Sequence, residues 1–416
     1  MGLGQTLVVP EMLGAVKGLH ARTAMRIGVA LIAGSALVGA LASCGTSSSA
    51  SSDNPSHQTR AYFIAADEQP WDYAPRHTNA ITGKPFDATA DTFVKQGPDR
   101  IGSRYLKALY RQYTDARFTT LLPRPASQAY LGDLGPIIRA EVGDTIQVTF
   151  RNNTRFPESM HPHGVFYQAA SEGAVYNNGI PEKDKPGDSV APGHTFTYTW
   201  EVPERAGPGP SDPSSIMWMY HGHVDEIADT YAGLIGPMII TRAGQANPDG
   251  SPKDVDKEFV ANFMVANENQ SPYLSANIAK YASNPKSVNR DDDDFIESNL
   301  MHSINGYVFG NQPMMTMTQG QHVRWYVMAM GTEVDLHTPH WHGNTLTSMG
   351  MRTDTISLLP GAMITADMTP DNAGIWLFHC HVNDHITAGM LTRYQVLPSS
   401  NAPPTESTAP AHTSGG

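Results

Sequence analysis

The sequence has little cysteine and little basic charge. The first shortage argues against a disulfide framework, and the second against nucleic-acid binding. Two cysteines among 416 residues are too few for a disulfide framework, and we expect no disulfide. Acidic residues outnumber lysine and arginine by 40 to 28, which gives a net charge of −12. Nucleic-acid binding needs a basic face, so we expect no nucleic-acid partner. The 40% of hydrophobic residues still allow two or three folded domains.

Long apolar runs are also missing, apart from one near the N-terminus. Basic residues precede the apolar segment 27–41, which is shorter than the roughly 20 residues that a membrane-spanning helix needs. The sequence Leu-Ala-Ser-Cys follows at residues 41–44, and it predicts a lipoprotein-type signal peptide over residues 1–44 with lipidation of Cys44. The alternative is a buried core helix. We therefore expect export to the cell envelope or periplasm and a lipid anchor to the membrane.

The segments that flank the predicted folded part have biased compositions. Residues 45–59 are rich in serine and predict a flexible tether. Residues 399–416 contain mainly Pro, Ser, Thr and Ala, which predicts a disordered tail. Two points stay open: Met25 is as good a start as Met1, and the protein is either anchored through Cys44 or released.

The remaining sequence has the patterns of β-structure. Residues 145–150 and 196–202 alternate between apolar and polar side chains, which predicts two half-buried strands. One short helix is expected over residues 103–114, as a surface insertion, because apolar side chains follow helical spacing there. Many short strands with Gly and Pro turns predict an all-β fold made of sandwich domains.

An internal repeat divides the folded part into two halves. The motif His-Pro-His-Gly at residues 161–164 matches His-Trp-His-Gly at 340–343, and His-Gly-His at 221–223 matches His-Cys-His at 379–381. The repeat predicts two homologous β-sandwich domains, over residues 60–243 and 256–398. The boundary between them falls in the polar stretch from Ala243 to Lys257.

One group of residues has the composition of a blue copper site. Such a site needs two imidazoles, one thiolate and a weak axial thioether in a trigonal arrangement. The candidates are His337, Cys380, His385 and Met390. A buried structural cysteine would not need histidines on both sides, so we favour the copper site.

Eight further histidines form four His-x-His pairs. In a strand, both histidines of such a pair point to the same side, so each pair can hold two neighbouring metal ions. Eight imidazoles suit three copper ions. Two of them flank Cys380 directly, which links the blue site to the cluster through one residue. The eight are His161, His163, His221, His223, His340, His342, His379 and His381.

These motifs resemble those of the multicopper oxidases, a family that includes laccases, ceruloplasmin-like ferroxidases and two-domain bacterial laccases. The resemblance covers residues 62–397, and the segments 62–66, 71–73 and 134–144 are similar to the ceruloplasmin branch. It implies two cupredoxin-like Greek-key domains and four copper ions per subunit equivalent: one type 1, one type 2 and a binuclear type 3 pair.

The resemblance also implies a role for each candidate ligand. Type 2 copper would be held by His161 and His340. The type 3 pair would be held by His163, His221, His223, His342, His379 and His381, and type 1 copper by His337, Cys380, His385 and Met390. In the first domain, the positions that match His337, Cys380 and His385 carry Glu158, Gly222 and Ile227, so no blue site is expected there.

Each domain would then carry half of the three-copper cluster. In the two-domain relatives, a first domain meets the second domain of the next subunit, which implies a homotrimer. Reduction of dioxygen to water consumes four protons, and the resemblance places Glu172 and Asp354 as acids near the cluster. The alternative for both is an ordinary turn or capping acid.

The predicted function is the one-electron oxidation of a donor at type 1 copper, coupled to the four-electron reduction of O2 to water. The donor, a phenol or a metal ion such as Cu+, Fe2+ or Mn2+, stays open. A non-catalytic copper carrier and a copper nitrite reductase are the alternatives, and the second of these keeps its blue site in the first domain. We interpret the methionines of the second domain as packing residues and the acidic run 291–294 as a solvated loop.

Overall fold

A computed structural model describes residues 57–399 of the chain. The predicted signal peptide with Cys44, most of the tether and all of the tail beyond residue 399 lie outside the described residues. Within residues 57–399 the chain is mostly β-strand with short helices, which confirms the predicted all-β class. None of the helices in this part is long and apolar enough to cross a bilayer.

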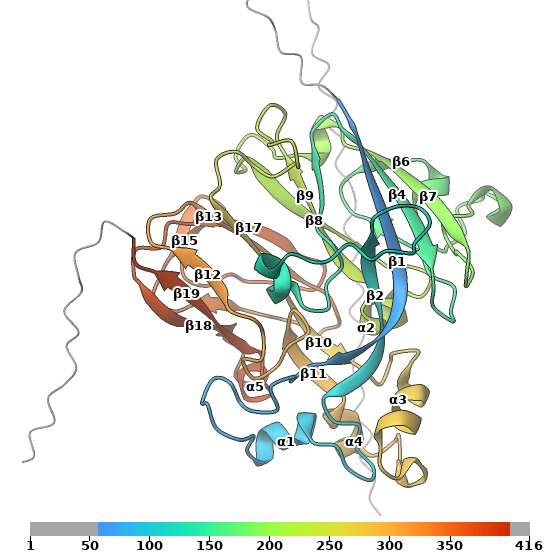
Figure 1. Ribbon diagram of the computed structural model, residues 1–416, viewed down its shortest axis with the longest axis vertical. Coiled ribbons are helices and arrows are strands. Elements are labelled where there is room, and N and C mark those ends of the chain that lie inside the picture. Colours follow the sequence, from blue (N-terminus) through green and yellow to red (C-terminus); the bar gives the residue numbers. More distant parts are fainter. Residues whose placement is uncertain (1–56, 400–416) are drawn as a thin grey trace, which may run out of the picture. The chain divides into compact units, whose positions relative to one another are not determined.

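The first sandwich, blue to green in Figure 1, consists of two sheets. Its five-stranded sheet has the order β2-β1-β4-β7-β6 and contains β1 (Thr59–Asp72), β2 (Arg104–Tyr113), β4 (Thr145–Asn152), β6 (Phe166–Tyr167) and β7 (Thr195–Glu201). Its four-stranded sheet has the order β3-β9-β8-β5 and contains β3 (Ile138–Glu141), β5 (His161–Pro162), β8 (Ser215–His221) and β9 (Ile235–Thr241). The two strands expected from alternating side chains are β4 and β7, and the apolar face of each is buried.

The second sandwich, yellow to red, is also built from two sheets. The larger has the order β11-β10-β13-β17-β15-β16 and contains β10 (Lys257–Asn267), β11 (Leu300–Ile304), β13 (Val323–Ala329), β15 (Leu346–Ser348), β16 (Met351–Thr353) and β17 (Met363–Met368). The smaller has the order β12-β19-β18-β14 and contains β12 (Met315–Thr318), β14 (Pro339–Trp341), β18 (Gly374–Cys380) and β19 (Leu391–Leu397).

Both sandwiches have the same strand pairing. The pairs β1/β4 and β3/β9 are parallel in the first sandwich, as are β10/β13 and β12/β19 in the second. In the smaller sheets, β5 pairs with β8 and β14 with β18, both antiparallel, and these strands carry the His-x-His motifs. The pairing therefore follows the predicted internal repeat, and residues 242–256 join β9 to β10.

The prediction of a helix over residues 103–114 is wrong. This segment forms β2, which pairs antiparallel with β1. Both faces of β2 are covered. Tyr110 packs in the core of the first sandwich, whereas Tyr105 and Lys107 point toward the second, where the fully buried ammonium of Lys107 pairs with Glu268. A strand buried on both faces loses its two-residue polarity pattern, and the apolar positions then match helical spacing by coincidence.

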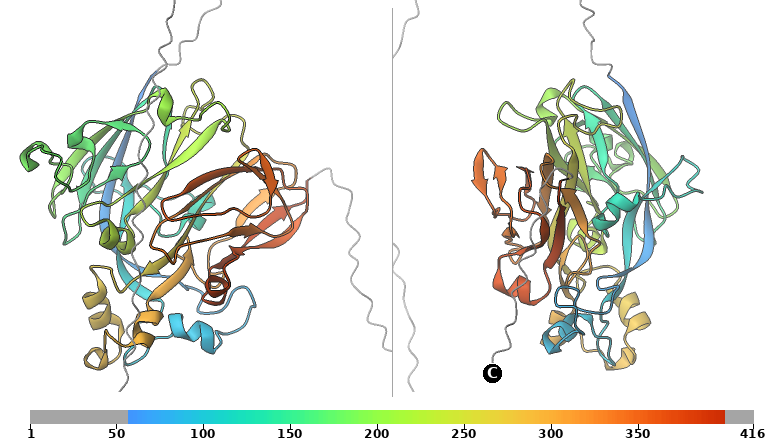
Figure 2. Two further views of the ribbon diagram at one scale, coloured as in Figure 1. Left: turned by 180° about the vertical axis from the view of Figure 1, so that it is seen from behind. Right: turned by 60° about the vertical axis from the view of Figure 1, so that its left-hand side comes forward.

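The helices lie in other places and are short. They are α1 (Ala88–Val94), α2 (Glu226–Ala232), α3 (Leu274–Tyr281), α4 (Asp293–Ser298) and α5 (Asn383–Thr387). Figure 2 shows α1, α3 and α4 grouped at one end of the described chain. The acidic run expected to be a loop instead starts α4, because the Asp292 carboxylate accepts a hydrogen bond from Phe295 N at 2.9 Å and caps the helix.

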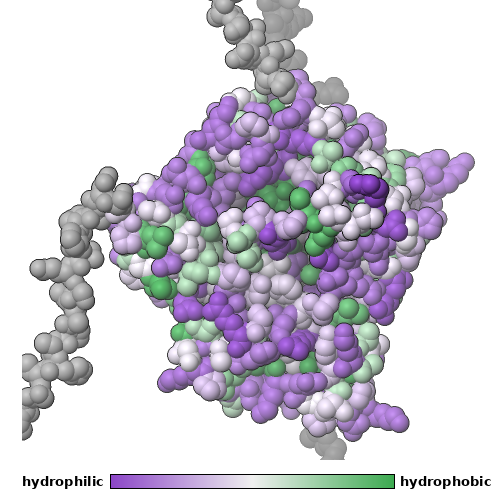
Figure 3. Space-filling view, viewed as in Figure 1, coloured by the Kyte–Doolittle hydropathy of each residue, from purple (hydrophilic) through white to green (hydrophobic). Residues whose placement is uncertain are grey.

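The packing interpretation applies to seven methionines, namely Met314, Met315, Met317, Met328, Met330, Met349 and Met351, and it holds for four of them, while Met314 is half-buried. These four are buried in the core, namely Met315, Met317, Met328 and Met330. Met349 and Met351, at the turn between β15 and β16, are exposed instead. On the face shown in Figure 3, hydrophilic residues dominate and hydrophobic residues gather in small groups.

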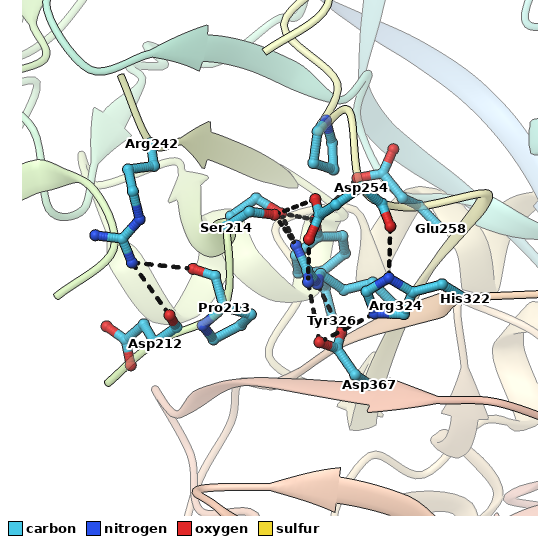
Figure 4. Close-up of polar contacts among 12 residues, drawn as sticks. Asp212, Pro213, Ser214, Arg242, Asp254, Glu258, His322, Arg324, Tyr326 and Asp367 are labelled. Atoms are coloured by element: carbon cyan, nitrogen blue, oxygen red, sulfur yellow. Dashed lines mark hydrogen bonds and ion pairs between the residues drawn. The ribbon is translucent and has the colours of Figure 1, made fainter. Parts of the chain in front are cut away.

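Buried charged groups join the two sandwiches, and Figure 4 shows one such group. The guanidinium of Arg324, on β13, donates to both carboxylate oxygens of Asp367, on β17, at 2.6 and 2.9 Å. It also donates to the hydroxyls of Ser214 and Ser215, at the start of β8, at 2.6 and 2.7 Å. Since β8 ends at His221, this network ties a strand that carries candidate ligands to the second sandwich.

Candidate metal centres

Three of the four predicted type 1 donors converge in the second sandwich. Cys380 Sγ lies 3.5 Å from His385 Nδ1 and 3.8 Å from His337 Nδ1, and the two Nδ1 atoms are 3.1 Å apart. All three residues are buried. Cys380 ends β18, and His385 lies in α5. The arrangement suits one ion bound by two imidazoles and a thiolate, which is the donor set of a blue copper site.

The fourth predicted donor, Met390, is tied to the same turn. Its side chain is fully buried, its N–H donates to the His385 carbonyl at 2.8 Å, and its carbonyl accepts from Cys380 N at 3.1 Å. The Cys380 sulfur also accepts a weak hydrogen bond from Thr338 N at 3.4 Å. Burial raises the pKa of the Cys380 thiol, so metal binding must displace its proton.

Asp335 orients His337, a role that the sequence patterns do not predict. Its carboxylate is fully buried and lies 3.2 Å from His337 Nε2. It also accepts hydrogen bonds from Val265 N at 2.6 Å and Thr332 N at 2.9 Å. The contact leaves Nδ1 of His337 directed at Cys380, as a carboxylate behind a metal-binding imidazole does. The only signal in the sequence is an acidic residue two positions before His337.

The second sandwich also carries one half of the predicted cluster. The antiparallel register of β14 and β18 places His340 opposite His379. His379 Nε2 lies 3.2 Å from His340 Nδ1 and 2.9 Å from His342 Nε2, and its own Nδ1 is held by the Cys380 carbonyl at 2.6 Å. His381 is exposed, with its ring centroid 5.3 Å from that of His340.

The first sandwich carries the other half in the same way. The register of β5 and β8 places His161 opposite His221. His163 Nε2 lies 3.0 Å from His221 Nε2, and the rings of His161 and His223 have centroids 5.1 Å apart. The carbonyl of Glu172 holds His161 Nδ1 at 2.7 Å.

The two halves face separate recesses. His161 and His163 line a recess of about 500 Å³, and His340 and His342 line another of about 480 Å³. These recesses share no residue, and within residues 57–399 no histidine ring of one half contacts a ring of the other. Each sandwich therefore carries four of the eight predicted histidine ligands, and the two sets of four lie apart within one chain.

Burial prepares several of these imidazoles for metal binding. It lowers the pKa of His163, His221 and His385 to about 4, with neighbouring histidines adding to the effect at each. These rings are neutral at neutral pH, so their lone pairs are available to a metal ion without competition from a proton.

The two acids predicted near the cluster have different surroundings. Asp354 Oδ2 lies 3.5 Å from His340 Nε2, although its carboxylate is 56% exposed. The carboxylate of Glu172 instead accepts a hydrogen bond from the Tyr176 hydroxyl at about 3 Å, and only its carbonyl reaches His161. Asp354 therefore contacts a candidate ligand directly, whereas the Glu172 side chain does not.

In the first sandwich, carboxyl groups occupy the position equivalent to the blue site. A Cβ atom added to Gly222 would lie 2.6 Å from the Cβ of Asp229, so Asp229 fills the space of a cysteine side chain. Burial raises the pKa of Asp229 to about 7 and that of the neighbouring Glu158 to about 9. No imidazole or thiol stands at this position, and the donor set does not suit blue copper.

Comparison with known proteins places this geometry in context. Two family models, both described as multicopper oxidase, match residues 130–245 and 277–400. Human Ferroxidase HEPHL1 is 45% identical over 341 residues, which are 81% of this chain and 29% of that protein. Human Hephaestin is 42% identical over 352 residues, with 84% and 30% covered. Rat Ceruloplasmin is 43% identical over 349 residues, with 83% and 33% covered. The chain spans about three tenths of the length of these relatives.

Solved structures share the fold. "Multicopper Oxidase mgLAC" matches with a TM-score of 0.51 at 18% identity, over 84% of this chain and 89% of that one. A second structure, described as a multicopper oxidase, has a TM-score of 0.50 at 21% identity, over 81% and 89%. These likenesses confirm the predicted cupredoxin-like fold.

Proposed function

The chain belongs to the multicopper oxidase family, whose cofactor is copper, and from this premise we propose that it oxidises ferrous or cuprous ions and passes the electrons to dioxygen. Its donor atoms, imidazole nitrogens and one buried thiol, fit that cofactor. When bound, the copper ions accept electrons one at a time and deliver four of them to dioxygen. The residues of the chain bind these ions, orient the ligands and supply protons.

One observation carries the proposal: β18 serves both candidate centres. Cys380 turns its sulfur toward His337 and His385, while its neighbour His379 turns its ring toward His340 and His342. One peptide unit thus separates the residue that would receive the electron from a residue that would hold the oxygen-reducing ions. A copper carrier needs binding sites but has no use for this direct connection.

The surroundings of His385 include one exposed candidate ligand for a metal-ion donor. His302, on β11, is buried, its ring centroid lies 5.3 Å from that of His385 with the ring planes tilted by 53°, and the Leu300 carbonyl holds its Nδ1 at 2.9 Å. Asp384 is exposed beside His385. An exposed carboxylate is a ligand for a metal ion, whereas a phenol needs an apolar rim, and Val334, whose backbone reaches His385, also exposes an apolar side chain here. The relatives named ferroxidase agree with the choice of a metal ion as donor.

The separation of the two recesses supports a cluster that forms between subunits. Two histidines line each recess and two more lie beside them, and the eight come together only if the first sandwich of one copy meets the second sandwich of another. Such a head-to-tail contact is heterologous and must close into a ring. We therefore keep the homotrimer as part of the proposal, with three clusters held at three equivalent contacts.

The two acids have distinct proposed roles. Asp354 would hold a proton at Oδ2, beside His340 Nε2, and release it as dioxygen is reduced. Its exposed carboxylate can take a new proton from solvent. Glu172 would not supply a proton but would position a ligand, since its backbone carbonyl holds the His161 ring in place. Export and a lipid anchor at Cys44 also remain proposals.

Oxygen consumption by the copper-loaded full chain tests the function. We would supply ferrous ions, cuprous ions and 2,6-dimethoxyphenol separately, under conditions in which each donor oxidises slowly by itself. We expect uptake with the metal ions and little with the phenol. The Cys380→Ser variant should lose the uptake, because serine removes the thiolate that links donor and cluster.

The other outcomes separate the alternatives. Rapid turnover of the phenol alone would identify a laccase and overturn the choice of donor. A full copper complement without oxygen uptake from any donor would leave a copper carrier. Consumption of nitrite in place of oxygen would identify a nitrite reductase.

A further inference from the structure

Exposed charged residues that form no ion pair within residues 57–399 lie at the edge of each histidine recess: Arg205 at the first, and Arg352 and Asp371 at the second. Arg205 lines the first recess, and its guanidinium lies 5.7 Å from the Phe166 ring centroid. Asp371 lines the second recess, where only its backbone atoms form hydrogen bonds. Within residues 57–399 neither of these two side chains takes part in an ion pair.

The two residues lie on equivalent loops of the internal repeat. Arg205 belongs to Pro-Glu-Arg-Ala-Gly at residues 203–207, between β7 and β8. Asp371 belongs to Pro-Asp-Asn-Ala-Gly at residues 370–374, between β17 and β18. Each loop therefore leads into the strand that carries a ligand pair, and both loops border the surface where the two halves of the cluster must meet.

From this placement we infer that Arg205 of one copy pairs with Asp371 of the next copy, across the contact that completes the three-copper cluster. The inference rests on the proposed function, because that function requires the two recesses to face each other. The partner is a second copy of this chain. The opposite charges would select the head-to-tail contact, whereas two first sandwiches would bring two arginines together.

The strength of such a pair determines which substitution is informative. Ion pairs at an exposed rim contribute little to binding, so Arg205→Met should change the assembly by less than about threefold. Like charges brought face to face are much more costly. Reversal of one charge is therefore the sharper test, and reversal of both restores an attractive pair in the opposite sense.

The experiment compares Arg205→Glu, Asp371→Arg and the double variant in the copper-loaded full chain. Analytical ultracentrifugation gives the oligomer dissociation constant, and the copper content per chain gives the occupancy of the cluster. We expect each single reversal to weaken assembly by at least about tenfold and to lower the copper content, while the blue absorption of the type 1 site stays. The double variant should return to within about threefold of the wild type.

Arg290→Glu, a reversal on the loop before α4, is the matched control and should leave assembly unchanged. Failure of the double variant to recover, or single reversals that behave like the control, would overturn the pairing. A wild-type protein that is monomeric yet consumes oxygen would also overturn it while leaving the oxidase intact. Absence of oxygen uptake by an assembled wild type would instead remove the proposed function.

Discussion

At the scale of single residues, Asp335 links the candidate type 1 site to the surrounding backbone. Its Oδ1 accepts from Val265 N and contacts His337 Nε2, and its Oδ2 accepts from Thr332 N. The first two contacts are buried, and the third is partly buried. The carboxylate therefore holds both the loop and the imidazole, and it sets which ring nitrogen is directed at Cys380.

Asp335→Asn should weaken copper binding at the type 1 site. The amide keeps the shape but loses the charge, and its NH2 group would face a backbone N–H that now has no acceptor. Loss of such a group behind a metal ligand lowers metal affinity by roughly 10–100-fold. Titration with a copper chelator, followed by the blue absorption, measures the change. Glu333→Gln, an exposed acid on the same loop, is the control, and equal affinities for both variants would contradict the assigned role.

At the scale of elements, the relation between β8 and the second sandwich matters most. β8 starts at Ser215 and ends at His221, so its position determines where the first half of the cluster lies. Arg324 anchors its start, and Arg324 itself is only 1% exposed. The neighbouring hydroxyl of Tyr326 continues this network by donating to Glu258 at 2.8 Å.

Arg324→Met should destabilise the fold. The substitution removes the cation from Asp367 and leaves two serine hydroxyls without their donor. Loss of one partner of a buried pair costs about 3–5 kcal/mol, and the 28% exposure of Asp367 reduces this to about 2–4 kcal/mol. Urea unfolding of the copper-free protein measures the free energy of unfolding. Arg104→Met, at an exposed pair with Asp72, should cost under about 1 kcal/mol, and a similar loss in both variants would argue against the anchor.

At the scale of the whole molecule, mixing two inactive variants tests whether the eight histidines of one cluster come from one chain or from two. His163→Ala removes a ligand from the first half and His342→Ala removes one from the second half, so each variant alone should lose oxygen uptake. In a closed ring of three, every mixed trimer contains one intact contact. An equal mixture that is assembled together should therefore recover about a quarter of the wild-type rate.

A mixture of His161→Ala and His163→Ala is the control, because both changes affect the same half and no contact is intact. The type 1 site is untouched in all three variants, so the blue absorption should persist and report correct folding. No recovery in the first mixture, with blue absorption and assembly retained, would show that each cluster belongs to a single chain.

Much of the site could be predicted from the sequence because its ligands are close together along the chain. The His-x-His motifs and Cys380 lie on short strands, where neighbouring residues alternate between faces, so spacing alone indicates which side chains share a side. The same local rule predicted β4 and β7, each of which has one apolar face. The repeat of the motifs also indicated two sandwiches with one pairing scheme.

Tertiary structure decided the features that depend on contacts between distant segments. The segment 103–114 is a strand whose outer face is covered by the second sandwich. The local sequence pattern cannot predict this contact, because it involves residues far away along the chain. Asp335 and His302 gain their roles from side chains that meet only after folding. The sequence determined which residues can bind copper, since donor chemistry is a property of each side chain. The fold decided that they form two separate halves, since the distance between β5 and β14 depends on how the two sandwiches pack.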